Sequence, residues 1–383
     1  MQTIKKRMLI ISLNQSERDS GGIEQYNRKL IQLFNNDFIV DEFDFIKTSN
    51  NKNPLVNSKH FIMDFDTWKN KSWFYRNFYY RKEMQKQLNV YLKNRSYDIF
   101  INATNICFNK IYKKNGYIFV VHFDPVFISN SNLGCTIIDR IKSMIFHLML
   151  FLFNQKNPLI NAKNIVAFFQ SFIPDKYVNY NTTYHYIPIA KYSENEINEI
   201  WSKYNNNFTD KYHKKIMYLG RIENHQKNVQ YLIENFNNID YYGIIENNEL
   251  KEKIRDNYKG ILTNNQELQS AFFNHSFTIL ASKSEGFPNV FVESLSTCTP
   301  IISSHLIKAN NYFNIKKNDI GFILNVNNSS NSKKLLDTID QLTLDKYSEM
   351  CKNAYDFAIN NLTIEKFNSK WKNTVAEIIK KQS

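Results

Sequence analysis

Short apolar runs alternate with longer amphipathic stretches along this chain, and the rhythm starts afresh once near its middle. The first apolar run, Met8–Leu13, is followed by an amphipathic stretch over Gly22–Phe34. Alternation of this kind predicts parallel strands joined by helices that cover both faces of a sheet. Because the rhythm restarts at Lys215, we expect an α/β protein of two doubly wound units, with a hinge near Pro188–Ser193.

The pattern also gives approximate bounds for the elements of each unit. In the first half the expected elements are strands over Met8–Leu13, Phe38–Phe45, Asp98–Asn102, Tyr117–His122, Asn164–Ala167 and His185–Ile187, and helices over Gly22–Phe34 and Tyr75–Lys93. In the second half they are strands over Lys215–Gly220, Ile239–Gly243, Phe277–Ala281 and Pro300–Ser303, and helices over Asn228–Phe236, Leu250–Tyr258 and from about Val290. The expected domains are residues 1–190 and 191–365, and a final helix over 366–383 is expected to pack back on the first domain.

Composition limits the class of protein and its partners. A chain of 383 residues is long enough for two cores, and its net charge of +13 favours a nucleic acid, an anionic membrane surface or a phosphorylated small molecule. The first apolar run is too short for a signal peptide, and no window of about 18 uncharged apolar residues could span a membrane. The cysteines are scattered without a CxxC pair, which favours a reducing compartment and argues against a zinc site. They are Cys107, Cys135, Cys298 and Cys351.

Ligands of doubly wound sheets bind beyond the carboxyl ends of the strands, so the strand-to-helix loops are the places to seek chemistry. In the first loop, Gly21 and Gly22 allow an anion to approach the backbone at a helix N-terminus, although an ordinary glycine turn explains them equally well. In the second loop, GRIENHQK, Arg221 and Lys227 can converge on one anion. Two solvated surface cations would account for that segment as readily.

The third loop, SKSEGFPNVFVES over Ser282–Ser294, is the most informative. A turn at Gly286 followed by a proline at the helix start would aim backbone amides at an anion. Glu285 and Glu293, separated by seven residues, place one carboxylate on the loop and the other in the helix. A carboxylate accepts hydrogen bonds from a vicinal diol. A capped helix alone would explain Glu293 but not the other features.

The motifs GGIE, GRIENHQK and SEGFPNVFVES, in this order and spacing, resemble those of family 4 retaining glycosyltransferases of the bacterial surface-polysaccharide type. The resemblance covers nearly the whole chain. It implies a GT-B fold, in which two Rossmann-like domains face each other across a cleft. It also implies transfer of a hexose or N-acetylhexosamine from a nucleotide-sugar, UDP-linked rather than GDP-linked, to a lipid-linked or polysaccharide acceptor. The setting would be lipopolysaccharide, O-antigen or capsule biosynthesis, without a metal or a cofactor.

The resemblance also assigns roles by position. Glu293 would hold the ribose, Glu285 the transferred sugar, and Arg221 with Lys227 the diphosphate. The implied catalytic residues are Glu285, His122, Arg221 and Lys227. Further donor contacts would come from Gly21, Gly22, Gly286, Phe287, Pro288, Asn289 and Val290, and acceptor contacts from Glu24 and Asp124. Arg221 and Glu285 are expected on exposed loops.

Two departures from the family pattern stand out. Cys298 occupies the position, five residues after the second glutamate, where the family usually has glycine. The segment Ser303–Leu306 replaces a glycine-rich turn. These departures concern the geometry of the donor loop more than the class of reaction.

Other readings remain open. An epimerase-like enzyme or a phosphorylase of the same fold, an inactive partner of another transferase, and a basic nucleic-acid-binding protein are alternatives, although no nucleic-acid-binding motif is present. Asp64 and Asp66 form a DxD of the kind that metal-dependent sugar transferases use, but because a clear strand context is lacking we expect surface residues without a metal role. The apolar block 136–153 predicts either a core helix or a helix on a membrane surface, and the aromatic and cationic stretch Trp73–Lys82 favours peripheral contact with the inner face of the plasma membrane. A cytoplasmic location is expected.

Overall fold

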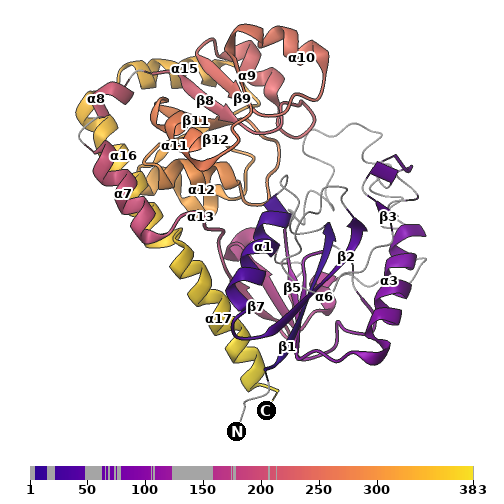
Figure 1. Ribbon diagram of the computed structural model, residues 1–383. Helices are drawn as coiled ribbons and strands as arrows, with labels where there is room; N and C mark the ends of the chain where they lie inside the picture. Colours follow the sequence, from indigo (N-terminus) through magenta and orange to yellow (C-terminus); the bar gives the residue numbers. More distant parts are fainter. Residues whose placement is uncertain are drawn as a thin grey trace. The chain divides into compact units, whose positions relative to one another are not determined.

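A computed structural model describes two compact units, each built on its own parallel sheet (Figure 1). The first unit comprises Met1–Ile187 with Asn368–Ser383, and the second comprises Pro188–Phe367. The residues that the structure describes are 5–14, 22–47, 63–64, 66–67, 70–72, 75, 79–104, 106, 108–122, 158–173, 175, 178–205, 208–212 and 214–382.

The first unit contains a seven-stranded sheet in the order β3-β2-β1-β4-β5-β6-β7, in which all pairs of neighbouring strands are parallel. The strands are β1 (Arg7–Asn14), β2 (Ile39–Lys47), β3 (Met63–Asp64), β4 (Ile99–Asn102), β5 (Tyr117–Val120), β6 (Asn164–Ala167) and β7 (Thr183–Tyr186). The helices are α1 (Gly22–Phe34), α3 (Tyr80–Tyr91) and α6 (Pro158–Asn161), with short 3-10 turns η2 (Leu92–Asn94) and η3 (Gln170–Phe172).

The core of the first unit forms around β1. Four consecutive residues of this strand, Met8–Ile11, are completely buried, as is typical of a strand covered on both faces. The strand pairs with β2 on one side and β4 on the other. The apolar face of α1 contributes Leu30 and Phe34 to the same core. The continuous apolar run at the start of the chain therefore becomes the central strand of the sheet.

The end of the chain belongs to this unit as well. Helix α17 (Ile364–Lys380) carries Trp371, whose side chain is completely buried and whose Nε1 donates a hydrogen bond to the hydroxyl of Tyr26, at 3.1 Å. The ring of Phe34 packs edge-on against the same indole, with a centroid distance of 6.4 Å. Residues about 340 positions apart in sequence thus share one aromatic cluster.

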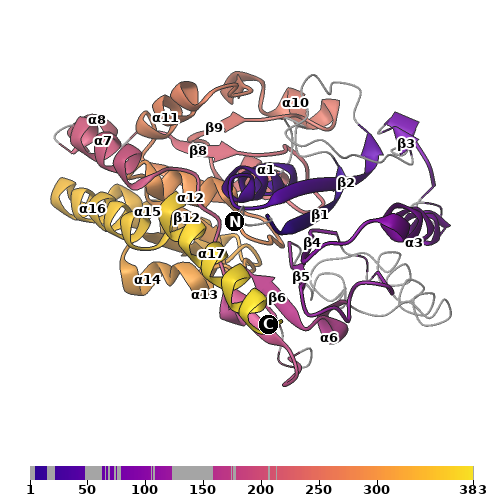
Figure 2. The same ribbon diagram turned by 60° about the horizontal axis from the view of Figure 1, so that its bottom comes forward.

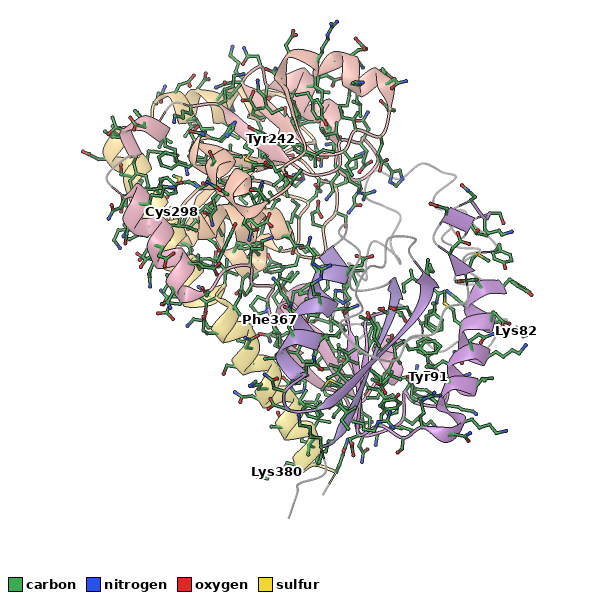
Figure 3. All side chains as sticks on the ribbon, in the orientation of Figure 1. Lys82, Tyr91, Tyr242, Cys298, Phe367 and Lys380 are labelled. Atoms are coloured by element: carbon green, nitrogen blue, oxygen red, sulfur yellow. The ribbon has the colours of Figure 1, made fainter. Side chains whose placement is uncertain are left out.

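Helix α3 lies within the range Tyr75–Lys93 that the periodicity predicts. Its α-helical part runs from Tyr80 to Tyr91 and tightens into the turn η2 over Leu92–Asn94, and residues 76–78 lie outside the described part of the chain. The ring of Tyr91 lies 4.8 Å from that of Phe43 on β2, and the exposed Lys82 points outward on the other side of the helix (Figure 3). Packing of the aromatic face on the sheet fixes this helix.

The second unit contains a six-stranded parallel sheet in the order β10-β9-β8-β11-β12-β13. The strands are β8 (Ile216–Leu219), β9 (Ile239–Tyr242), β10 (Tyr258–Gly260), β11 (Phe277–Leu280), β12 (Ile301–Ser304) and β13 (Gly321–Leu324). The helices are α7 (Glu194–Tyr204), α8 (Phe208–Lys211), α9 (Val229–Asn235), α10 (Asn248–Lys253), α11 (Asn265–Phe273), α12 (Asn289–Ser296), α13 (Asn310–Phe313), α14 (Ile315–Asn318), α15 (Ser330–Asp340), α16 (Leu344–Asn361) and the start of α17, with the 3-10 turn η5 (Arg255–Asn257).

One expected helix of this unit is wrong. The range Leu250–Tyr258 was expected to be a single helix, but α10 ends at Lys253, η5 follows, and Tyr258 begins the strand β10. Asp256 and Asn257 compete for backbone hydrogen bonds and so favour turns over helix interiors. The polar end of the stretch Leu250–Tyr258 therefore forms a turn and the start of an edge strand, although its pattern is typical of an amphipathic helix.

The topology of the second unit determines where its loops gather. Strands β8 and β11 are neighbours in the middle of the sheet, so the loops that follow them emerge side by side at its carboxyl edge. Figures 1 and 2 both draw α10 and α12 on opposite sides of this sheet, as right-handed crossovers in the two directions require. None of the helices in the described part of the chain is both long and apolar enough to cross a bilayer.

Candidate functional site

The loops that follow β8 and β11 are joined by hydrogen bonds from both backbone and side chains. The amide of Lys283 donates to the carbonyl oxygen of Gln226, at 2.8 Å. In return, Nε2 of Gln226 donates to the carbonyl oxygen of Ser284, at 2.9 Å. Nδ2 of Asn228 adds a third link to the carbonyl oxygen of Ala281, at 3.3 Å. The second and third sequence motifs are thus parts of one structure, which we call the joined loops (residues 220–228 and 281–288).

An ion pair lies at the centre of the joined loops. Nζ of Lys227 is 2.6 Å from Oε1 of Glu285, and Oγ of Ser282 donates to the same oxygen at 2.7 Å. The side chains of Lys227 and Glu285 are only 16% and 10% exposed, so water screens their attraction much less than at an open surface. Glu285 was expected on an exposed loop, and that expectation is wrong: the residue is buried because Ser282 and Lys227 enclose its carboxylate.

The loop after β8 is shaped by a carboxylate that the sequence analysis did not single out. The buried side chain of Glu223 accepts hydrogen bonds from the amides of His225 at 2.6 Å, Gln226 at 3.1 Å and Lys227 at 2.7 Å. Three successive amides turned toward one carboxylate force the chain to wrap around it, and this turn presents Lys227 to Glu285. The available signal was an acidic residue at the start of a polar loop, where a carboxylate commonly accepts from nearby amides.

Arg221 is oriented differently from Lys227. Its side chain is 55% exposed, Nη1 lies 3.3 Å from Oε1 of Glu246, and Nη2 lies 3.3 Å from Oε1 of Gln226. Exposed ion pairs of this length contribute little to stability, so the guanidinium can exchange these partners for an anion at low cost. The structure therefore brings Lys227 to Glu285 and leaves Arg221 on the outer side of the same loop.

The exit from β8 depends on close backbone packing. Gly220 has a φ of +153°, and its amide donates to the carbonyl oxygen of Tyr242, at 3.0 Å. The hydroxyl of Tyr218 donates to the carbonyl oxygen of Arg221, at 2.6 Å. Burial, followed by the nearby charge of Glu285, raises the pKa of Tyr218 well above its usual value, so this hydroxyl remains a donor and holds the loop.

Helix α12 begins at the end of the second joined loop. Pro288 is its N-cap, and Gly286 lies in the bend that precedes it. Phe287 anchors the bend, with its ring 5.3 Å from that of Phe313. The first amides of a helix have no intrahelical acceptor and carry a partial positive charge, so those of Asn289 and Val290 suit an anion. Oδ1 of Asn289 is buried and has no hydrogen-bond partner among the described residues.

The second glutamate of the motif, Glu293, lies one turn into α12. Its side chain is 14% exposed, and Oε1 lies 3.4 Å from Nζ of Lys191. Lys191 belongs to the segment between β7 and α7, outside all three motifs, and the sequence analysis did not identify it. A lysine in a linker has no distinctive spacing, so no sequence signal was available to identify this contact.

The C-terminal end of α12 explains one departure from the family pattern. Cys298, labelled in Figure 3, is completely buried and has a φ of +55°, a conformation that glycine adopts without strain. Nζ of the buried Lys211 donates to the carbonyl oxygen of Cys298, at 3.4 Å, and to the hydroxyl of Thr299. Burial lowers the pKa of Lys211 to about 8. The turn that glycine would form freely is thus held by a lysine contact.

In the first unit, His122 follows β5 and lies within the aromatic cluster of α1. Its ring is edge-on to that of Tyr26, with centroids 4.8 Å apart, and 5.9 Å from that of Phe168. Nε2 is buried without a hydrogen-bond partner among the described residues. Burial lowers the pKa of His122 to about 3. The imidazole is therefore neutral at physiological pH and can accept or donate one hydrogen bond without carrying charge.

The depressed pKa of His122 predicts a specific dependence of stability on pH. Unfolded histidine takes up a proton near pH 6.5, whereas His122 in the folded protein does so only near pH 3, so acid favours the unfolded state across this window. Wild type should lose unfolding free energy as the pH falls from 6.5 to 3. In His122→Asn we expect this loss to be smaller by roughly 2 to 4 kcal/mol. Urea titrations at several pH values measure the unfolding free energy of both proteins. The exposed His305→Asn serves as control, and identical pH slopes for wild type and His122→Asn would contradict the assignment.

The other residues proposed for the acceptor side are only partly described. Gly22 is the exposed first residue of α1, and Glu24 is buried in its first turn. Gly21 and Asp124 lie outside the described residues, as do the apolar block 136–153 and half of the stretch Trp73–Lys82.

Asp64, the first residue of the DxD sequence, has a local structural role. The carboxylate of Asp64 accepts from the amide of Thr67 at 2.9 Å and from its hydroxyl at 2.6 Å, and these bonds lower the pKa of Asp64. Among the described side chains, no group of three or more His, Cys, Asp or Glu residues could hold a metal ion. Asp64 therefore stabilises the turn that follows β3.

Comparison with known proteins places this geometry in context. Residues 213–345 match the family model for glycosyl transferases group 1, and no curated protein sequence matches the chain. Sucrose-phosphate synthase from Thermosynechococcus elongatus is similar in structure, with a TM-score of 0.69, 12% identity, and coverage of 98% of this chain and 99% of the other. WaaG, a glycosyltransferase involved in lipopolysaccharide biosynthesis, has a TM-score of 0.69, 12% identity, and coverage of 97% and 99%. Anabaena HepE in complex with UDP has a TM-score of 0.62, 13% identity, and coverage of 97% and 100%.

At such low identity the structural likeness establishes the fold and nothing finer. The two doubly wound, Rossmann-like units have the GT-B fold of these structures, so the expected α/β fold class is confirmed. The matched stretch runs through β8, both joined loops and α12. The chain thus has the GT-B fold, and a stretch of its second unit matches the glycosyl transferases group 1 model.

Proposed function

We propose that this chain is a retaining glycosyltransferase that moves a hexose or N-acetylhexosamine from a UDP-linked donor onto a lipid-linked or polysaccharide acceptor. One observation carries the proposal: the shielded ion pair of Lys227 and Glu285, held by the joined loops at the carboxyl edge of a group 1 domain. It supplies a cation for a diphosphate and a carboxylate for a sugar within 2.6 Å of each other.

The chemistry of the reaction calls for these groups. When the bond between the sugar and the phosphate breaks, negative charge grows on the diphosphate and positive charge on the sugar ring. Lys227, Arg221 and the first amides of α12 stabilise the diphosphate, because fixed dipoles and charges cost little reorganisation. The acceptor hydroxyl forms the new bond to the sugar and gives its proton to the departing phosphate oxygen. Such a route needs no nucleophile from the protein.

The two carboxylates of the third motif serve different parts of the donor in this proposal. Glu285 lies beside the cation that meets the phosphate, so it accepts from hydroxyls of the transferred sugar. Glu293 lies one turn into α12 and accepts from the ribose hydroxyls. We assign to His122, neutral because of its low pKa, the role of an uncharged hydrogen-bonding group for the transferred sugar, and to Glu24 and Asp124 contacts with the acceptor.

The setting proposed is bacterial lipopolysaccharide, O-antigen or capsule biosynthesis on the cytoplasmic side of the membrane. The net charge of +13 supports peripheral contact with anionic lipid, and the structural likeness to WaaG supports a surface polysaccharide as product. The reaction as proposed uses neither a metal nor a cofactor.

The decisive experiment combines donor binding with product analysis. Calorimetry should detect binding of UDP in preference to GDP, and incubation with UDP-sugars and a lipid-linked oligosaccharide should yield an extended acceptor. The anomeric proton in the NMR spectrum of the product should show the configuration of the donor, and EDTA should leave the rate unchanged. Release of free or epimerised sugar at the same rate without acceptor would instead indicate an epimerase-like enzyme and would overturn the proposal.

A further inference from the structure

The linker between β7 and α7 brings a lysine to the carboxylate assigned to the ribose. Nζ of Lys191 lies 3.4 Å from Oε1 of Glu293. The Lys191 side chain is 24% exposed and that of Glu293 14%, so the pair is partly shielded, unlike the exposed pair of Arg221 and Glu246. The contact lies wholly within the second unit, 102 positions apart in sequence.

The backbone that carries Lys191 is firmly held on its C-terminal side. The side chain of Tyr192 is 1% exposed, and its carbonyl oxygen accepts from the amide of Ile364 at 3.0 Å. Ser193 caps α7: its hydroxyl accepts from the amide of Glu196 at 3.2 Å, while the Glu196 carboxylate accepts from the amide of Ser193 at 2.7 Å. A side chain that leaves such a fixed backbone loses less conformational entropy when it forms an ion pair than one on a mobile loop.

We propose that Lys191 is a positioning residue for donor recognition: its ammonium orients the carboxylate of Glu293 and offsets the charge of that carboxylate, so that Glu293 can accept the ribose hydroxyls. This inference rests on the proposed function. A carboxylate has about four acceptor sites, and an ammonium at 3.4 Å from Oε1 engages at most one of them.

Charge balance gives the second reason. A nucleoside diphosphate brings several negative charges close to α12, and an unpaired carboxylate there would repel it. Lys191 removes that repulsion at Glu293, as Lys227 does at Glu285. Each carboxylate of the third motif is therefore paired with a lysine, one pair for each end of the donor. The two pairs differ in role because Lys227 also faces the phosphates.

If Lys191 acts through Glu293, its effect on nucleotide affinity depends on the ribose hydroxyls. A lysine that merely attracted the phosphates would show no such dependence. The dissociation constants of UDP and 2′,3′-dideoxy-UDP are measured by calorimetry for wild type, Lys191→Met and Lys191→Arg. We expect Lys191→Met to weaken UDP about tenfold, a change equivalent to about 1.4 kcal/mol, and to weaken dideoxy-UDP by a much smaller factor, the part that charge repulsion alone causes. Lys191→Arg should restore most of the affinity. Lys333→Met, which removes the same charge from the exposed face of α15, is the matched control and should behave as wild type.

The Glu293→Gln background tests the same coupling. There, adding Lys191→Met should cause no further loss of UDP affinity, because the carboxylate that the lysine serves is gone. Equal weakening of UDP and dideoxy-UDP by Lys191→Met, or unchanged UDP affinity in a folded variant, would overturn the inference and leave the proposed function standing. Failure of the wild-type protein to bind either UDP or GDP would instead overturn the proposed function, and this inference with it. Thermal melting of each variant confirms that the comparison is between folded proteins.

Discussion

Replacing Glu285 by glutamine is expected to lower the turnover number for sugar transfer by about 10² to 10³-fold, the range found when a pre-set electrostatic group is removed from an active site. Glutamine keeps the volume of the side chain and can still accept from Ser282, so the fold should persist. It cannot balance the charge of Lys227, which lies 2.6 Å away. Loss of the carboxylate should therefore affect the reacting sugar while leaving the cation available to the diphosphate.

This division gives the experiment a second measurement. Calorimetric affinity for UDP should stay the same or increase in Glu285→Gln, because a negative charge near the phosphates has been removed, while transfer nearly ceases. Glu234→Gln, on the exposed face of α9, provides a matched control and should retain wild-type turnover. Wild-type turnover in Glu285→Gln itself would show that the ion pair is structural and that the site assignment is wrong.

The second large effect is expected on stability, at the packing of two glycines. A Cβ atom on Gly243 would lie 1.9 Å from the carbonyl oxygen of Gly220, and the φ of Gly243 is +130°. Gly243→Ala should therefore lower the free energy of unfolding by about 4 kcal/mol, which combines backbone strain with overpacking against a backbone atom. Because Gly220 begins the first joined loop, the same change should also weaken UDP binding. Urea denaturation and calorimetry measure the two effects.

A neighbouring glycine separates strain from collision. Gly260 has a φ of +92°, but a Cβ there would meet no heavy atom within 4 Å. Gly260→Ala should cost only about 1 to 2 kcal/mol, the strain contribution alone. If both variants lose the same stability, the close approach of Gly243 to Gly220 does not determine the fold of this loop.

Much of the architecture follows from hydrophobic periodicity. The helix Gly22–Phe34 has the bounds that its amphipathic pattern predicts, and Asn164–Ala167 is a strand over the expected residues. In both segments, most of the apolar residues that the hydrophobic pattern predicts to be buried are buried in the structure. The strand β10 was missed because its three residues follow a polar turn and carry no apolar run of their own. The strand β13 and the helices α13 to α16 were not among the elements that the periodicity defined, whereas the final helix expected over 366–383 corresponds to α17, Ile364–Lys380.

Site residues that lie within one sequence motif could be predicted from the sequence. Contacts that the fold creates between distant segments could be predicted less well. Lys227 and Glu285 came from motifs, yet their ion pair depends on the adjacency of β8 and β11. Glu223 acts through backbone amides, and its one signal in the sequence is an acidic residue at the start of a polar loop. Lys191 contacts a carboxylate 102 positions away, and the linker beside it bonds to the distant helix α17 through Tyr192, so no local sequence pattern records the contact.

The hydrogen bonds between the two joined loops have a consequence for how donor preference could evolve. Gln226 bonds to both Lys283 and Ser284, so a shift of the segment beside the phosphate must carry along the segment beside the sugar. Substitutions within the hydrogen-bonded joined loops would disturb binding of both the phosphate and the sugar of the donor. New donor specificities should therefore arise from side chains at the periphery of these loops, while the hydrogen bonds between the loops are retained.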